Sequence, residues 1–221
     1  MMKIKGLVFD FDGLILDTET GEVKIWEKIL QQFGLVLPMD QYLQYVGHAT
    51  DNQFVQNILH DLGLTDAQIQ SALIEYENLF STSDFFKTPR EGIREFIQSG
   101  KGNGFNLGIA SNSYSDWVIG HLQNLDLEQF FNPICTREAV SNSKPDPELY
   151  NLVLRKWNFL PQEVLAFEDS PNGILAAKNA GIFCIAVPNP LTANMDNSAA
   201  DLLFNSFTEM DLHQITHGLK K

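Results

Sequence analysis

Cysteine is scarce in this chain of 221 residues, which holds only Cys135 and Cys184. Two cysteines cannot build the disulfide framework of a small secreted protein, and both stand in apolar, strand-like surroundings. We therefore expect buried, reduced thiols and regard a single disulfide as the less favoured alternative. The chain also lacks an apolar run near the roughly 20 residues that a membrane span needs. Its first apolar stretch is short, is interrupted by Asp10 and has no small-residue cleavage site, so we expect a cytoplasmic protein without a membrane partner.

Positive charge is scarce as well. Fifteen basic side chains face 28 acidic ones, and the formal net charge is -13. This charge opposes binding to the phosphate backbone of nucleic acids and to anionic membrane surfaces, so we expect neither as a partner. A small phosphorylated metabolite remains a candidate if a metal or local positive groups neutralise it. The oligomeric state stays open.

Short strand-like segments alternate along the chain with helical patterns. This alternation is typical of a parallel sheet covered by helices, and 44% hydrophobic residues suit a globular α/β protein. The candidate strands are 4–9, 106–110, 133–135, 164–167 and 183–187.

The segment between the first two candidate strands departs from this alternation. Residues 18–88 show only helix periodicity, and Thr65 with Gln68 forms a capping box before one of the helices. The pattern predicts a helical domain inserted after the first strand, with hinges near 15–18 and 86–90. The predicted bounds are 1–16 and 88–221 for the α/β core and 17–87 for the helical cap.

Polar side chains follow several of the candidate strands. The carboxyl ends of parallel strands share one edge of a sheet, where ligands bind. The residues predicted at that edge are Asp10 and Asp12 after the first strand, Ser111 and Asn112 after "NLGIA", Lys144 in "SKPDPELY", and Glu168 and Asp169 after "VLAF". Hydroxyl, amide and ammonium groups suit phosphate oxygens, while several carboxylates together need a cation. The set indicates a magnesium-dependent phosphoryl-transfer site.

Two alternatives concern the aspartate pair alone. An isolated Asp-x-Asp is most often a polar loop after a buried strand. A calcium loop of the EF-hand type is excluded because Leu14 would occupy a ligand position.

Four motifs together resemble one known family. "VFDFDGLILDT", "IASNS", "KPDPELY" and "FEDSPNGILAAKNAGI" are similar to the haloacid dehalogenase-like hydrolases, in the branch whose helical cap follows the first strand. That branch includes small phosphatases and β-phosphoglucomutase. The resemblance covers nearly the whole chain and implies a Rossmann-like parallel sheet with an inserted all-helical cap.

The resemblance also implies roles for the acidic residues. Asp10 would be the nucleophile that forms an aspartyl-phosphate. Asp12 would protonate the leaving alcohol and then activate water, and its backbone carbonyl would bind Mg²⁺. Asp169 would supply a further metal-binding carboxylate, with Glu168 beside it as a direct or supporting ligand. Dehalogenation is not expected, because dehalogenases resemble this pattern without the second aspartate.

Substrate contacts are implied for five further positions. Ser111, Asn112 and Lys144 would hold the transferring phosphoryl group, with Lys144 also offsetting nearby negative charge. Thr18 stands where the family's cap approaches the phosphate. Glu22 in "DTETGEVKIW" replaces the histidine of the mutase-like pattern "DTAxxHxxAW".

Three functions remain open at this stage. The leading one is a magnesium-dependent phosphatase acting on a sugar phosphate or a similar small metabolite. The second is a phosphomutase, and the third is a non-catalytic phosphate-binding regulator. The cap segment "YVGHATDNQF" favours the phosphatase, since Val46 and Thr50 stand where mutases carry basic residues. His48 in the same segment is expected to be structural, with a contact to the active site as the alternative.

Overall fold

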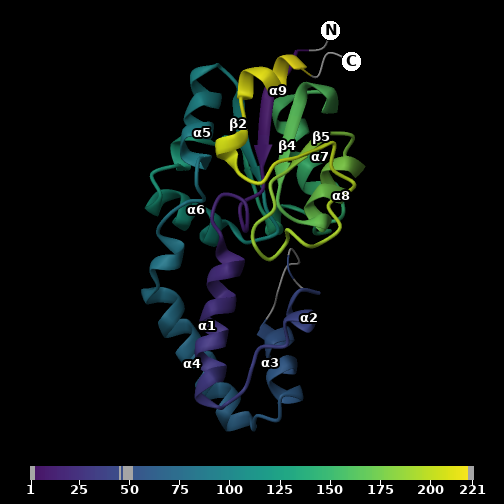
Figure 1. Ribbon diagram of the computed structural model, residues 1–221. Helices are drawn as coiled ribbons and strands as arrows, with labels where there is room; N and C mark the ends of the chain where they lie inside the picture. Colours follow the sequence, from purple (N-terminus) through teal and green to yellow (C-terminus); the bar gives the residue numbers. More distant parts are fainter. Residues whose placement is uncertain (1–2, 45, 47–51, 219–221) are drawn as a thin grey trace.

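The computed structural model describes residues 3–44, 46 and 52–218, and its centre is a parallel β-sheet (Figure 1). Six strands lie in the order β3-β2-β1-β4-β5-β6, and every neighbouring pair is parallel. The strands are β1 (Gly6–Phe9), β2 (Asn106–Ala110), β3 (Ile134–Cys135), β4 (Val164–Glu168), β5 (Phe183–Ala186) and β6 (Leu202–Leu203). The five predicted strands are confirmed to within two residues at each end. The sequence missed β6, because two residues carry no alternation pattern.

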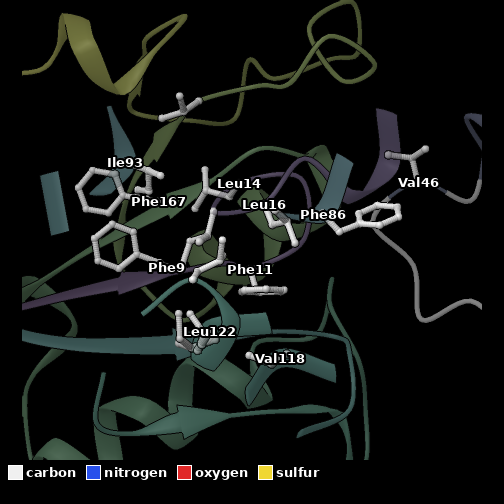
Figure 2. Close-up of a cluster of buried hydrophobic side chains, with 14 of the residues drawn as sticks. Phe9, Phe11, Leu14, Leu16, Val46, Phe86, Ile93, Val118, Leu122 and Phe167 are labelled. Carbon is white, nitrogen blue, oxygen red and sulfur yellow. The ribbon is translucent and has the colours of Figure 1, made fainter. Parts of the chain in front are cut away.

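The middle strand, β1, is buried on both faces, which explains its continuous apolar sequence "GLVF". Leu7 and Phe9 belong to the apolar cluster on one face, and Val8 belongs to the cluster on the other. The rings of Phe9 and Phe167, neighbours on β1 and β4, stack with their centroids 4.8 Å apart (Figure 2). This packing fixes the ends of β1 and β4, where the predicted acidic residues begin.

Helices cover both faces of the sheet. The core helices are α5 (Ile93–Gly102), α6 (Ser115–Asn124), α7 (Glu148–Trp157), α8 (Pro171–Asn179) and α9 (Leu212–Gly218). Apolar residues of α5, α6 and α9 join the cluster of Leu7, whereas those of α7 and α8 join the cluster of Val8. Short 3-10 turns lie at Asp84–Phe86, Glu128–Phe130, Arg137–Ala139, Pro161–Glu163 and Phe207–Glu209.

The chain between β1 and α5 forms the inserted cap, which extends away from the sheet as a separate group of helices (Figure 1). Its helices are α1 (Thr18–Gln32), α2 (Met39–Tyr42), α3 (Asn52–Asp61) and α4 (Asp66–Thr82). The capping box before α4 is confirmed, since Thr65 and Gln68 bond reciprocally. Trp26 of α1 stacks on Tyr76 of α4 at 4.6 Å and is buried, so Trp26 is part of the cap core.

Several other expectations can be compared with the structure. Cys135 and Cys184 are both free and buried, which confirms the reduced thiols. None of the described helices is both long and apolar enough to cross a bilayer. Val46 is buried, whereas His48 and Thr50 lie outside the described residues. The exact cap boundaries, 17–87, stay a prediction.

Candidate active site

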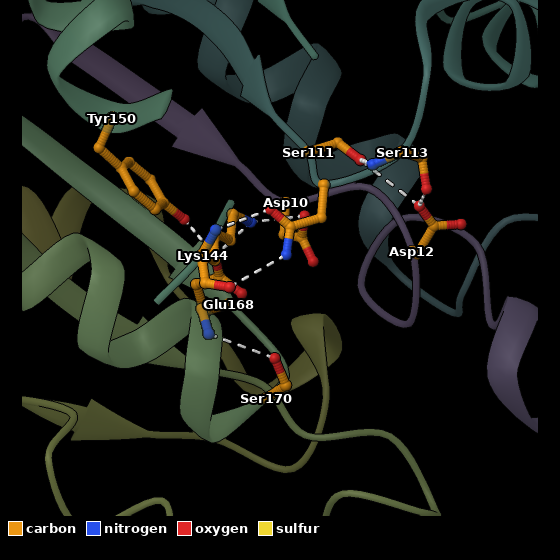
Figure 3. Close-up of polar contacts among 10 residues, drawn as sticks. Asp10, Asp12, Ser111, Ser113, Lys144, Tyr150, Glu168 and Ser170 are labelled. Carbon is orange, nitrogen blue, oxygen red and sulfur yellow. Dashed lines mark hydrogen bonds and ion pairs between the residues drawn. The ribbon is translucent and has the colours of Figure 1, made fainter. Parts of the chain in front are cut away.

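The candidate site lies at the carboxyl ends of β1, β2 and β4, three adjacent strands of the sheet. Asp10 follows β1, Ser111 follows β2, and Glu168 is the last residue of β4. The chain runs outward from β1 to β2 and β3, then crosses to β4 on the other side of β1 and continues to β5 and β6, so the ends of β1 and β4 flank the switch point where open α/β sheets bind ligands. Side chains far apart in sequence therefore converge here, such as Lys144 and Asp10, which are 134 positions apart (Figure 3).

Lys144 lies between two buried carboxylates. Its Nζ is 2.7 Å from Oδ1 of Asp10 and 2.7 Å from Oε1 of Glu168, which also accepts a hydrogen bond from the Tyr150 hydroxyl. Burial alone would lower the pKa of Lys144, but the two carboxylates outweigh it and raise that pKa above its usual value. Burial raises the pKa of Asp10 and brings that of Glu168 to about 7, against the opposing effect of Lys144. The ammonium group thus offsets charge that burial would otherwise make unfavourable.

Three carboxylates form a compact acidic cluster. Asp10, Glu168 and Asp169 each offer an oxygen, and these atoms lie within 4.8 Å of one another. Within the described part of the chain, Oε2 of Glu168 is buried without a hydrogen-bond partner. Burial raises the pKa of Asp169, and the charge of Asp10 raises it further. An all-oxygen set with an unsatisfied oxygen fits a hard divalent cation such as Mg²⁺.

Asn189 and Glu19 extend this cluster, and the sequence did not point to either as a site residue. The Asn189 side chain donates to Oδ2 of Asp169 and to Oε2 of Glu19, both at 2.8 Å. Burial raises the pKa of Glu19 to about 8, against this hydrogen bond. Glu19 is in the first turn of α1, so Asn189 connects the cap to a candidate metal ligand.

Gly13 lets the loop after β1 pass close to Asp169. Its φ is +75°, a region that favours glycine, and a Cβ here would lie 2.2 Å from Oδ2 of Asp169 and 2.7 Å from Nδ2 of Asn189. A glycine at position 13 is therefore favoured both by the backbone and by the close approach of Asp169.

The Asp12 side chain lies outside the acidic cluster and turns toward α6. Its Oδ1 accepts the indole N–H of Trp117 at 2.8 Å, and its Oδ2 accepts the Ser113 hydroxyl at 2.6 Å (Figure 3 shows the serine contact). Ser111 Oγ also reaches Oδ2, at 3.4 Å. The predicted metal contact of Asp12 involves its backbone carbonyl, not this carboxylate. Trp117 lies seven positions after Ala110, the end of β2, and no local signal connected it to the site.

Asn112 lies beside Lys144 and bonds to its main chain. Its Oδ1 accepts the Lys144 N–H at 2.8 Å, and its Nδ2 donates to the Lys144 carbonyl at 3.4 Å. These bonds hold the Lys144 loop against the loop after β2. Contact of Asn112 with a phosphoryl group stays a prediction.

Thr18 and Glu22 both lie on α1, at the cap side of the site. Thr18 is buried at the first position of the helix. Glu22 is one turn further along and accepts the Tyr42 hydroxyl at 3.1 Å. Burial raises the pKa of Glu22 to about 7, against this bond, and the charge of Asp12 adds to the rise. Thr18 and Glu22 thus lie on the cap side of the site, outside the group formed by Lys144, Asp10 and Glu168.

Comparison with known proteins identifies the class of protein to which this fold and this set of side chains belong. A model of the haloacid dehalogenase-like hydrolase family matches residues 7–187. The chain belongs to the haloacid dehalogenase-like hydrolases.

Several relatives carry the names of enzymes that act on phosphate esters. The chain is 36% identical over 209 residues to the Bacillus subtilis (strain 168) protein named "Putative phosphatase YhcW", covering 95% of this chain and 94% of that one. It is 28% identical over 179 residues to the "Phosphorylated carbohydrates phosphatase" of Thermotoga maritima, covering 81% and 82%. Among solved structures, the "putative beta-phosphoglucomutase" of Thermotoga maritima superposes with a TM-score of 0.73 at 26% identity, covering 98% of this chain and 99% of that one.

Proposed function

We propose that this protein is a magnesium-dependent phosphatase that hydrolyses a small phosphomonoester, such as a sugar phosphate, through an aspartyl-phosphate on Asp10. One observation carries the proposal: the Asp10 carboxylate lies beside two further carboxylates and touches the buried ammonium of Lys144. Family membership and the phosphatases among its relatives support hydrolysis of phosphoric monoesters. The cytoplasm is the location that the sequence predicts.

Asp10 and Asp12 have different roles in the proposed reaction. A carboxylate oxygen of Asp10 attacks phosphorus, and the bond from phosphorus to the substrate oxygen breaks. Asp12 gives its proton to that oxygen, then takes a proton from the water that hydrolyses the aspartyl-phosphate. Ser111 and Lys144 hold the phosphoryl oxygens, and Lys144 favours the ionised form of Asp10 through their 2.7 Å contact.

The acidic cluster holds the metal in this proposal. Asp10, Glu168 and Asp169 would be its side-chain ligands, together with the backbone carbonyl of Asp12. When bound, Mg²⁺ supplies positive charge that reduces repulsion between these carboxylates and the phosphate. Asn189 orients Asp169 by donating to its Oδ2.

A phosphomutase is the second candidate, because a solved structure titled as a β-phosphoglucomutase resembles this chain. A mutase must retain a bisphosphate intermediate while it turns around, which calls for cations in the cap. Within the predicted cap bounds 17–87 the lysines are Lys24, Lys28 and Lys87; all three are exposed, and Lys87 pairs with Asp84. Glu22 stands where the mutase-like pattern has a histidine, so this position of α1 supplies no cation either. Hydrolysis is therefore the function that the charges favour.

A panel of about a hundred phosphorylated metabolites, assayed for phosphate release with Mg²⁺ and with excess chelator, tests the proposal. We expect metal-dependent release from neutral sugar or polyol phosphates. Turnover of p-nitrophenyl phosphate separates an enzyme from a phosphate-binding regulator. Absence of release from every compound, including that ester, would contradict the proposal.

A further inference from the structure

The two oxygens of the Asp12 carboxylate have different surroundings. Oδ1 accepts the indole N–H of Trp117 at 2.8 Å. Oδ2 accepts from Ser113 at 2.6 Å and lies 3.4 Å from Oγ of Ser111. Ser111 directly follows β2, the neighbour of β1, and is proposed to hold the phosphoryl group, so Oδ2 is on the side where that group would lie, while Oδ1 is the oxygen anchored to α6.

Trp117 is itself held from two sides. Its ring lies edge-to-face against His121 of α6, with centroids 4.0 Å apart. On the cap side it packs against Phe80 of α4, at 5.2 Å. An indole has one N–H and no acceptor, so once its ring is packed it donates in a single direction. The packing therefore determines where Oδ1 of Asp12 lies.

We propose that Trp117 is a positioning residue that anchors Oδ1 of Asp12 and thereby directs Oδ2 toward the oxygen of the leaving alcohol. The proposal rests on the phosphatase mechanism above. In the first step Asp10 forms a bond to phosphorus, the bond from phosphorus to the alcohol oxygen breaks, and the proton on Oδ2 of Asp12 moves to that oxygen. Without the indole N–H, the carboxyl group rotates more freely and this proton is aligned less often.

The dependence on the leaving group provides the test. An alkoxide is a poor leaving group that needs the proton, whereas p-nitrophenolate leaves without one. The ratio kcat/KM covers the steps up to formation of the aspartyl-phosphate, and it therefore reports the protonation step separately from the later hydrolysis. Comparing glycerol 2-phosphate with p-nitrophenyl phosphate isolates the action of Asp12 as an acid.

The decisive variant is Trp117→Phe, which keeps an aromatic ring at the position that Phe80 contacts and removes the N–H. We expect kcat/KM for glycerol 2-phosphate to fall about tenfold and that for p-nitrophenyl phosphate to change less than about twofold, because misaligned proton transfer slows only the first substrate. The quotient of the two values does not depend on the fraction of folded enzyme. A partly folded variant therefore still tests the proposal. The proposal is overturned if kcat/KM falls equally for both substrates, if the variant is completely inactive, or if kcat/KM does not fall.

Trp157→Phe is the matched control. The Trp157 indole also donates an N–H, to the carbonyl of Asn132 at 2.8 Å, but it belongs to α7 and touches no candidate site residue among the contacts described above. For Trp157→Phe, the quotient of the kcat/KM values for the two substrates should equal that of the wild type.

Asp12→Asn separates failure of this proposal from failure of the proposed function. If the wild type hydrolyses neither ester, or if Asp12→Asn leaves both rates intact, the phosphatase mechanism is wrong. If Asp12→Asn shows the selective loss and Trp117→Phe does not, the mechanism stands and the role of Trp117 is overturned.

Discussion

Lys144 places one ammonium group between the buried carboxylates of Asp10 and Glu168. Removing one member of such a group leaves an uncompensated buried charge, which typically costs about 3–5 kcal/mol. Substituting any of these three side chains is therefore expected to change both the free energy of unfolding and the activity. Substitutions that keep size and hydrogen bonding are the ones that separate the two effects.

Asp10→Asn is such a substitution, and it tests the nucleophile. An amide is a very poor nucleophile and carries no charge for the metal, so we expect turnover below about 1% of wild type. The fold should persist, because the amide oxygen can still accept from Lys144. Steady-state phosphate release and thermal unfolding measure the two properties. Activity well above that limit would mean that another group attacks phosphorus.

Asp169→Ala tests the metal site. We expect chelation to stop hydrolysis by the wild type and Mg²⁺ to restore it, because the clustered carboxylates otherwise repel each other and the phosphate. The variant should need at least about tenfold more Mg²⁺ for half-maximal activity, or be inactive, since it lacks one ligand. Titration of activity with Mg²⁺ is the measurement. Full activity in excess chelator would exclude the assignment.

At the scale of elements, the loop after β1 brings the acidic residues together. Its path depends on Gly13, whose positive φ allows the turn and whose missing Cβ leaves room for Asp169. Asn189 lies on the other side of Asp169 and donates to it at 2.8 Å. The loop after β1, the end of β4 and the segment after β5 therefore meet at the Asp169 carboxylate.

Gly13→Ala should disturb this meeting point. The positive φ alone costs roughly 1–2 kcal/mol, and the added methyl would also press on Asp169. We expect lower stability and a higher Mg²⁺ concentration for half-maximal activity, measured by thermal unfolding and metal titration. Gly34→Ala is the matched control, because Gly34 has φ +68° with no atom within 4 Å of the added Cβ. It should lose similar stability and keep the Mg²⁺ titration unchanged; equal titrations for both variants would contradict the role of Gly13.

At the scale of the whole molecule, the acidic charge and the cap decide which substrates are suitable. The chain has a formal charge of -13, and the three lysines within the predicted cap bounds are all exposed. We therefore expect an ester with a neutral alcohol to approach this acidic, cation-poor molecule more readily than one with a second phosphate.

This charge argument leads to a prediction about mutase activity. With β-glucose 1-phosphate and a bisphosphate primer, we expect release of free phosphate and negligible formation of glucose 6-phosphate, because water reaches the aspartyl-phosphate before a repelled bisphosphate turns around. A coupled dehydrogenase assay run beside a phosphate assay compares the two rates. Glucose 6-phosphate formed faster than phosphate would favour the mutase.

Movement of the cap is the second prediction at this scale. Two connections join the cap to the core near 16–18 and 87–89, and the Arg90 N–H bonds to the Ile15 carbonyl at 2.9 Å where they meet. The Arg90 side chain is fixed to three core carbonyls, so movement is expected on the cap side of it. We expect a phosphate analogue with Mg²⁺ to reduce the radius of gyration in small-angle scattering and to slow hydrogen exchange at the two connections. Exchange in β4 should stay constant as the internal control, and unchanged scattering and exchange would count against a moving cap.

The sequence by itself determined the strands and the acidic cluster. Each predicted strand is an apolar run, and the ends of parallel strands must share an edge, so Asp10, Glu168 and Asp169 could be brought together from local patterns. Helix periodicity and the capping box at Thr65 likewise predicted an inserted helical cap, because both signals are contained within a few turns of chain.

Only the tertiary structure decided which side chains surround each carboxylate. Trp117 and Asp12 are 105 positions apart, and Asn189 and Glu19 are 170 positions apart. These contacts depend on how α6 and the segment after β5 pack against the loop that follows β1, and no periodicity or capping pattern encodes that packing. The two-residue strand β6 was missed for a related reason, since it forms by pairing with β5 rather than through any preference of its own. Local sequence therefore specified the reactive groups, and long-range packing specified their orientation.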